Sequence, residues 1–217
     1  SLEMIVSGSR RSLFVRSPLI GRHNVSNVLA AAAVSMGLGI PDDAVVSGID
    51  NLPPVPGRLQ RFSFENGVIC FIDYAHSPDG LEKALRTVGE ICPGSVHVVF
   101  GHGGERTQEN RPLLGRVAAE HAEHAVLTMD NPRSEDPMEI ARQIESGFKG
   151  PRLRSYAIIL DRREAVHAAL DAARKGGVVL VAGKGPETTM ILANGSVPYS
   201  DEESIMEWSE SRKIPLL

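Results

Sequence analysis

The segment HAVLTMDNPRSEDP (residues 124–137) joins an apolar run to polar residues that could bind an amino acid. Asp130, Asn131 and Arg133 lie within four positions of one another, where the apolar run ends. A guanidinium group binds a carboxylate through two parallel hydrogen bonds, and an acid beside an amide can bind an ammonium group. The cluster therefore predicts a site for a zwitterionic end group. The alternative is a tight Asx-Pro turn with a surface arginine.

A glycine-rich segment, GHGGERTQENRP (residues 101–112), follows another apolar run. Backbone N–H groups of such a loop can cradle an anion. The segment matches neither a Walker A pattern nor a complete dinucleotide fingerprint, so it is a weak candidate for a phosphate loop. Arg106 and Arg111 are better candidates, because either guanidinium group could bind a carboxylate.

A second glycine-rich segment, AGKGPETT (residues 182–189), follows the last strongly apolar run. Glycine lets a backbone approach a ligand closely, which makes Gly183 a candidate for the wall of a site. Glu187 is a second possible partner for an ammonium group. The alternative is a plain strand-to-helix loop in which Lys184 is solvated.

Three further groups of residues are candidates for a binding site, and the first of them suits a ribose hydroxyl or a metal-linked water. In DYAHSPDG (residues 73–80), Asp73 ends a predicted strand, where an acid can bind a ribose hydroxyl. The alternative there is a helix cap by Asp79, with Tyr74 and His76 packed nearby. Asn24 and Asn27 share one face at the start of a predicted helix, although Asn24 could simply cap it. Arg58 follows a glycine in a proline-rich stretch, although a surface arginine is usually only solvated.

The elements that must position these residues alternate regularly from residue 60 onward. Apolar strands are expected within residues 67–73, 95–100, 124–130, 155–161 and 176–183, with amphipathic helices between them. Asp136 and Asp161 are expected to cap two of those helices. This pattern predicts an α/β fold with a Rossmann-like, mostly parallel sheet covered by helices on both faces. Ligands bind beyond the carboxyl ends of such strands, where the polar clusters fall.

Residues 1–55 form a different segment, with one or two strands expected in SRRSLFVRSPL and a helix over HNVSNVLAAAAVSMGLG. The stretch NLPPVPGRLQRF contains three prolines and a glycine, which is typical of a hinge. We therefore place a boundary near Val55. The first segment has too few expected elements for a core of its own and looks like the remnant of a second α/β domain.

The composition narrows the class of protein. A net charge of −4 with 42% hydrophobic residues gives no electrostatic reason to expect nucleic acid. No apolar run approaches the roughly 20 residues of a membrane span, and Cys70 and Cys92 suit core positions in a reducing compartment. A cytoplasmic enzyme, or part of one, is expected. The histidines lack metal-ligand spacing, so no zinc site is expected.

Taken together and in order, the motifs resemble the C-terminal part of the Mur ligase family. The segments that carry the resemblance are GRHNVSNVLAA, PGR, DYAHSPD, GHGGERTQENRPLL, DNPRSEDP, DRREA and AGKGPE. They cover roughly residues 20–205. DNPR is similar to the signature of members that use meso-diaminopimelate rather than lysine. The resemblance implies that residues 1–55 are the end of a central ATPase domain plus a hinge, and that residues 56–217 are the amino-acid-binding domain.

The resemblance also implies an activity and the roles of the residues. ATP, with Mg²⁺, would activate the D-glutamyl carboxylate of UDP-MurNAc-L-Ala-D-Glu, and meso-diaminopimelate would be added in peptidoglycan precursor synthesis. This chain would hold diaminopimelate with Arg106, Asp130, Asn131, Pro132, Arg133, Gly183 and Glu187. It would face the nucleotide with Asn24, Asn27, Arg58, Asp73, Tyr74 and His76. No catalytic residue is expected in it, nor nucleic-acid binding or membrane insertion, and a monomer is expected.

Two departures and several alternatives accompany this interpretation. The sequence contains no G-x-x-x-x-G-K-[ST], so we expect a fragment that ligates nothing alone and holds no cofactor tightly. Pro186 stands where the family usually has histidine, and Thr188 and Thr189 also depart from the pattern. The alternatives are a free-standing amino-acid or nucleotide binding module and another Mur-like ligase such as folylpolyglutamate synthetase. A nicotinamide dehydrogenase is disfavoured, because DYAHSPDG lacks the glycine fingerprint.

Overall fold

The computed structural model describes residues 2–7 and 12–217. The chain divides into two compact units, Ser1–Val55 and Pro56–Leu217. Within the described residues, no helix has the length and apolar character that crossing a bilayer requires. The assignment of the first unit to a central ATPase domain stays a prediction.

The first unit contains a two-stranded antiparallel sheet and two helices. The strands are β1 (Leu2–Ser7) and β2 (Ser12–Ser17), and the helices are α1 (Arg22–Gly37) and α2 (Asp42–Asp50). Part of the expected strand region, residues 9–11, lies outside the described residues. Helix α2 was not predicted. It completes a small buried cluster, so the expectation that this segment lacks a core of its own was wrong; the buried residues are Val6, Leu13, Val15, Val28, Ala32, Val45 and Ile49.

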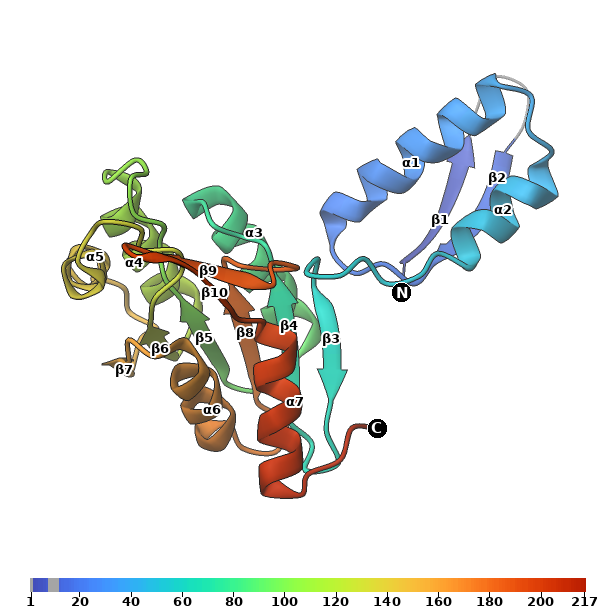
Figure 1. Cartoon of the computed structure of the whole chain (residues 1–217). Coiled ribbons are helices and arrows are strands. Elements are labelled where there is room, and N and C mark those ends of the chain that lie inside the picture. The colour runs from blue at the N-terminus through green and yellow to red at the C-terminus, as the bar shows by residue number, and fades with distance from the viewer. Residues whose placement is uncertain (1, 8–11) are drawn as a thin grey trace. The chain divides into compact units, whose positions relative to one another are not determined.

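The second unit is built on a six-stranded sheet with the strand order β3-β4-β8-β5-β6-β7 (Figure 1). All neighbours in this sheet pair in parallel except β3 and β4. The predicted class, a mostly parallel sheet within an α/β fold, is therefore confirmed. The strands are β3 (Gln60–Ser63), β4 (Ile69–Asp73), β5 (Val96–Phe100), β6 (His124–Leu127), β7 (Ser155–Ile158) and β8 (Val178–Ala182).

Helices cover both faces of this sheet. Figure 1 shows α6 (Arg162–Ala172) and α7 (Asp201–Arg212) together on one face, where Trp208 and Leu170 join the buried side chains of β4 and β8. On the other face lie α3 (Pro78–Ile91), α4 (Asn110–His121) and α5 (Pro137–Glu145). A separate hairpin of β9 (Thr189–Leu192) and β10 (Gly195–Pro198) precedes α7.

Short-range sequence signals explain where several helices begin. The Asp136 side chain accepts a hydrogen bond from the Met138 N–H, and Asp161 accepts one from the Glu164 N–H. Both caps were predicted and are confirmed; each satisfies a helix N–H that has no partner within the helix. Helix α3 is capped by Ser77 instead of Asp79, with Pro78 in its first turn.

A buried ion pair ties α6 and α7 to the end of β8 and to the loop that follows β6. The Arg162 guanidinium donates to both carboxylate oxygens of Asp201, at 2.8 and 2.9 Å, and both side chains are fully buried. The same guanidinium donates to the carbonyl oxygens of Met129 at 3.1 Å and Ala182 at 2.9 Å. Because Met129 and Ala182 directly precede Asp130 and Gly183, this pair sets the position of the polar loops that follow.

Replacing Arg162 with methionine should lower the free energy of unfolding by about 3–5 kcal/mol, because Asp201 would remain as an uncompensated buried charge. Urea denaturation followed by the fluorescence of Trp208, the one tryptophan of the chain, would measure the change in the second unit. Arg163→Met is the matched control. Arg163 pairs with Glu207 at the surface, so its loss should cost about 0–1 kcal/mol. Equal effects would contradict the role of the buried pair.

Candidate functional site

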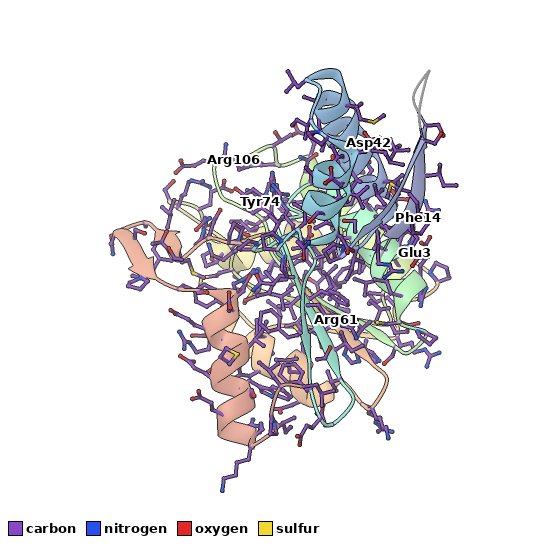
Figure 2. The ribbon with its side chains drawn as sticks, turned by 90° about the vertical axis from the view of Figure 1, so that its right-hand side faces the viewer. Glu3, Phe14, Asp42, Arg61, Tyr74 and Arg106 are labelled. Atoms are coloured by element: carbon purple, nitrogen blue, oxygen red, sulfur yellow. The ribbon has the colours of Figure 1, made fainter. Side chains whose placement is uncertain are left out.

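The loops that follow β4, β5, β6 and β8 meet in one cleft of about 350 Å³ at the carboxyl ends of these strands. Figure 2 labels two of its residues, Tyr74 and Arg106, which come from different loops. The predicted site residues that line the cleft are Tyr74, His76, Arg106, Asp130, Asn131, Arg133, Gly183 and Glu187. Residues more than a hundred positions apart in the chain are thus brought together.

The glycines of the β5–α4 loop are explained by the neighbouring loop, which passes very close to them. A Cβ atom at Gly101 would lie 2.2 Å from the Thr128 carbonyl oxygen, and one at Gly104 would lie 1.9 Å from that of Pro132. The Gly104 N–H also donates to the Asn131 carbonyl oxygen at 2.9 Å. These glycines are therefore required for packing against the DNPR segment, and a phosphate-binding role is not needed to account for them.

Arg133 is held in an unusual backbone conformation that fixes its direction. Its φ angle of 54° lies in the left-handed region, which non-glycine residues seldom adopt. The Arg133 N–H donates to the Ile191 carbonyl oxygen at 3.0 Å, and Nη1 donates to the carbonyl oxygen of Gly104 at 2.7 Å. One side of the guanidinium group is thus anchored by the protein. Pro132 supplies its carbonyl oxygen to the turn, where it accepts from the Glu135 N–H at 3.1 Å.

Asp130 is a buried acid with an unsatisfied oxygen. The residue is 8% exposed, and Oδ2 has no hydrogen-bond partner among the described residues. Gly183 lies against it with a φ of 112°, and a Cβ atom at Gly183 would come within 2.5 Å of that oxygen. A carboxylate that is removed from water without a partner costs free energy. Its presence beside a cleft is therefore a strong indication of a cationic ligand group.

Glu187 is already engaged with protein groups on one of its oxygens. Oε2 accepts from the Lys184 ammonium at 2.8 Å and from Asn131 Nδ2 at 2.9 Å. Burial raises the pKa of Glu187, but the hydrogen bonds from Lys184 and Asn131 outweigh it and hold the pKa below its usual value. Lys184 is fully buried, and a hairpin follows its loop. The alternative of a strand-to-helix loop with a solvated lysine was therefore wrong on both points.

Arg111, which sequence reasoning ranked with Arg106 as a carboxylate binder, serves a structural role. It is fully buried and donates to both oxygens of Glu135, at 2.9 and 3.0 Å. It also donates to Gln143 Oε1 at 2.7 Å. Arg106, by contrast, is exposed and lines the cleft. Only Arg106 of the two is placed to bind a ligand there.

Of the residues expected on the nucleotide side, some line the cleft and others do not. Tyr74 and His76 line the same cleft as Arg133, whereas Arg58 lies beside it, with its guanidinium carbon 5.1 Å from the centre of the Tyr74 ring. The Asp73 carboxylate accepts from the backbone N–H groups of Leu59 at 2.8 Å and Ala75 at 2.9 Å. Asp73 therefore has a local structural role, because it holds two backbone N–H groups at the end of β4.

Asn24 and Asn27 belong to the first unit. Gly21, and not Asn24, occupies the cap position of α1. Asn24 Nδ2 donates to the Ile20 carbonyl oxygen at 2.7 Å, and Asn27 Nδ2 donates to Asn24 Oδ1 at 2.9 Å. The two amides thus form a connected pair on one face of the helix, as their spacing indicated.

Sequence reasoning missed several residues of the site. His102, Thr107 and Asn110 line the cleft from the β5–α4 loop and the start of α4. Burial, and next the Arg111 guanidinium, lower the pKa of His102. Lys184, which is fully buried beside the cleft, was assigned no role.

The chain matches known proteins along most of its length. Residues 57–185 match the family described as Mur ligase, glutamate ligase domain. The UDP-N-acetylmuramoyl-L-alanyl-D-glutamate–2,6-diaminopimelate ligase of Chromobacterium violaceum is 42% identical, over 96% of this chain and 43% of that protein. The ligase of the same name from Geobacillus kaustophilus is 40% identical, over 88% of this chain and 39% of that protein.

Solved structures give the same result. A structure of UDP-N-acetylmuramoyl-L-alanyl-D-glutamate–2,6-diaminopimelate ligase superposes with a TM-score of 0.71 and 31% identity, over 97% of this chain and 43% of that chain. UDP-N-acetylmuramate–alanine ligase from Thermotoga maritima shares the fold, with a TM-score of 0.67 at 20% identity. The chain spans about two fifths of the length of the relatives that it matches. On these matches, the chain belongs to the Mur ligase family.

Proposed function

We propose that this chain is the amino-acid-binding part of an ATP-dependent ligase that adds meso-diaminopimelate to UDP-MurNAc-L-Ala-D-Glu in peptidoglycan precursor synthesis. The observation that carries the proposal is the unsatisfied carboxylate of Asp130, which lies in one cleft with Arg106 and Arg133. These groups complement the carboxylate and ammonium groups of an amino acid. The names of the relatives supply the substrate.

The reaction needs an amine held still while an activated acid approaches. In the ligase, ATP held with Mg²⁺ would supply the phosphoryl group that converts the D-glutamyl carboxylate into an acyl phosphate, and ADP would be released. The amine nitrogen of diaminopimelate then forms the amide bond, the bond from carbon to the phosphate oxygen breaks, and phosphate leaves with the amine proton passing to solvent. The part of this chain is to bind and orient the amino acid, which lowers the entropic cost of bringing the reactants together.

The second unit also has residues suited to a nucleotide beside the cleft. Arg58 could bind phosphate oxygens from its position over the Tyr74 ring. Asp73 is fixed by two backbone N–H groups at the end of β4, where an acid suits a ribose hydroxyl. The sequence contains no Walker A motif, so Arg58 and Asp73 would contribute only part of a nucleotide site. Independently of these two residues, the resemblance to Mur ligases assigns Asn24 and Asn27 of the first unit to the adenine.

Arg133 is the residue proposed to choose diaminopimelate over lysine. Hydrogen bonds from Nη1 to the carbonyl oxygens of Gly104 and Asn131 anchor one side of its guanidinium. Nη2 and Nε make no hydrogen bond with the described residues and would be available to a ligand carboxylate. Lysine lacks the distal carboxylate of diaminopimelate. In a lysine complex the guanidinium would lose that partner, and an unpaired polar group in a binding site reduces affinity strongly.

This chain should bind meso-diaminopimelate more tightly than L-lysine, and Arg133→Ala should weaken meso-diaminopimelate binding by roughly 10- to 100-fold, the value of a charge-assisted pair. Titration of ¹⁵N-labelled chain by NMR detects weak binding and would locate it at the cleft. Arg116→Ala, on the exposed face of α4, is the control and should leave the affinity unchanged. Equal binding of the two amino acids would refute the proposed selectivity.

Asp130→Asn should weaken meso-diaminopimelate binding without lowering the free energy of unfolding. The substitution removes the charge that attracts the ammonium group, yet Oδ2 has no hydrogen bond among the described residues to lose. The NMR titration and urea denaturation followed by Trp208 fluorescence would be compared on the same sample. A large loss of stability together with unchanged binding would show that Asp130 is a structural acid.

A chimaera would test the ligation itself. Residues 56–217 would replace the matching domain of the Chromobacterium violaceum ligase, which is 42% identical. The chimaera should release phosphate from ATP only when meso-diaminopimelate and UDP-MurNAc-L-Ala-D-Glu are both present, and Arg133→Ala in it should abolish most of that release. A folded chimaera that prefers lysine, or that accepts neither amino acid, would contradict the proposed function.

A further inference from the structure

Lys184 is a buried cation that the proposed function does not yet explain. Its side chain is fully buried in the loop between β8 and β9, although lysine is almost always solvated. A buried ammonium group is tolerated when charged and polar partners surround it. Lys184 Nζ has two such partners, Glu187 Oε2 at 2.8 Å and Asn131 Oδ1 at 3.0 Å.

The lysine fixes the orientation of the Asn131 amide. Asn131 Oδ1 accepts from Lys184 Nζ and also from the Ile191 N–H at 2.9 Å, which uses both of its lone pairs. Asn131 Nδ2 must then face the opposite way, and it donates to Glu187 Oε2 at 2.9 Å. The amide oxygen is therefore occupied, so Asn131 orients Glu187 and is not placed to accept a hydrogen bond from a ligand ammonium group.

The lysine also changes the charge that the cleft presents. Glu187 and Lys184 form a pair whose charges cancel, whereas Asp130 keeps an oxygen without a partner among the described residues. We propose that Lys184 is a positioning residue: it neutralises Glu187 and turns Asn131, so that the cleft presents one carboxylate without an ion-pair partner among the described residues, that of Asp130, instead of two. This inference rests on the proposed function for its ligand.

The resulting charge matches the form of diaminopimelate that can react. With one amine uncharged for attack, the amino acid carries two carboxylates and one ammonium group, a net charge of −1. Arg106, Arg133 and Asp130 together give the cleft a net charge of +1. If Glu187 were not neutralised, the cleft would be neutral and the complex would retain an unbalanced charge. Such a charge is costly where water is excluded.

The first test needs no ligand. The pKa of the Glu187 carboxyl would be followed by ¹³C NMR in the wild-type chain and in Lys184→Met. Removal of the lysine should raise the pKa of Glu187, whereas Lys83→Met should not, because Lys83 pairs with Asp79 at the surface. An unchanged Glu187 titration in Lys184→Met would overturn the proposal. Should Lys184→Met fail to fold, Lys184→Met/Glu187→Gln, which lacks both charges, is expected to fold; its failure would equally overturn the proposal.

The second test measures the coupling between the two residues. Lys184→Met should weaken meso-diaminopimelate binding by roughly tenfold or more, and adding Glu187→Gln should restore affinity to within a few-fold of Glu187→Gln alone. Simply additive losses would overturn the charge-balancing role. If the wild-type chain does not bind meso-diaminopimelate at all, the proposed function fails, while the titration of Glu187 still decides whether Lys184 controls its charge.

Discussion

The buried pair of Arg162 and Asp201 is the interaction on which the geometry of the site depends. One guanidinium group holds α7 through Asp201 and, through two carbonyl oxygens, the end of β8 and Met129 in the loop that follows β6. Asp130 and Gly183 come one residue after these two contacts. Their relative position is thus set by the packing of α6 and α7 on the sheet, and not by the loops themselves.

The charged side chains in and around the cleft differ in whether they have a partner within the protein. Arg111 with Glu135, and Lys184 with Glu187, are paired within the protein. Asp130 keeps an unsatisfied oxygen, and Arg106 and Arg133 line the same space. Satisfied pairs give the walls their rigidity, whereas the remaining groups form the surface that a charged amino acid can complement. The same residue types therefore serve two purposes, and only three-dimensional contacts distinguish them.

Much of the fold follows from local signals in the sequence. The caps at Asp136 and Asp161, and the apolar runs of β4, β5, β6 and β8, depend on neighbours within a few residues. Strand β3 was missed because it lies in a proline-rich stretch and exists only by pairing with β4. The sequence indicated the residues of four loops that line the cleft, because strand ends are recognisable. The burial of Lys184 was not predicted, since its partner Asn131 lies 53 positions away in the chain.

The left-handed backbone of Arg133, which the proposed function makes the residue that selects the amino acid, depends on a hairpin that lies almost 60 positions later in the chain. That conformation is maintained by the hydrogen bond to Ile191, and the adjoining contact with Leu192 lies on β9. Any residue that replaced Arg133 would inherit this left-handed backbone, which β-branched residues tolerate least and which glycine, asparagine and aspartate tolerate best. Hydrogen bonding to the hairpin therefore narrows the side chains that position 133 can accept, unless the hairpin changes with it.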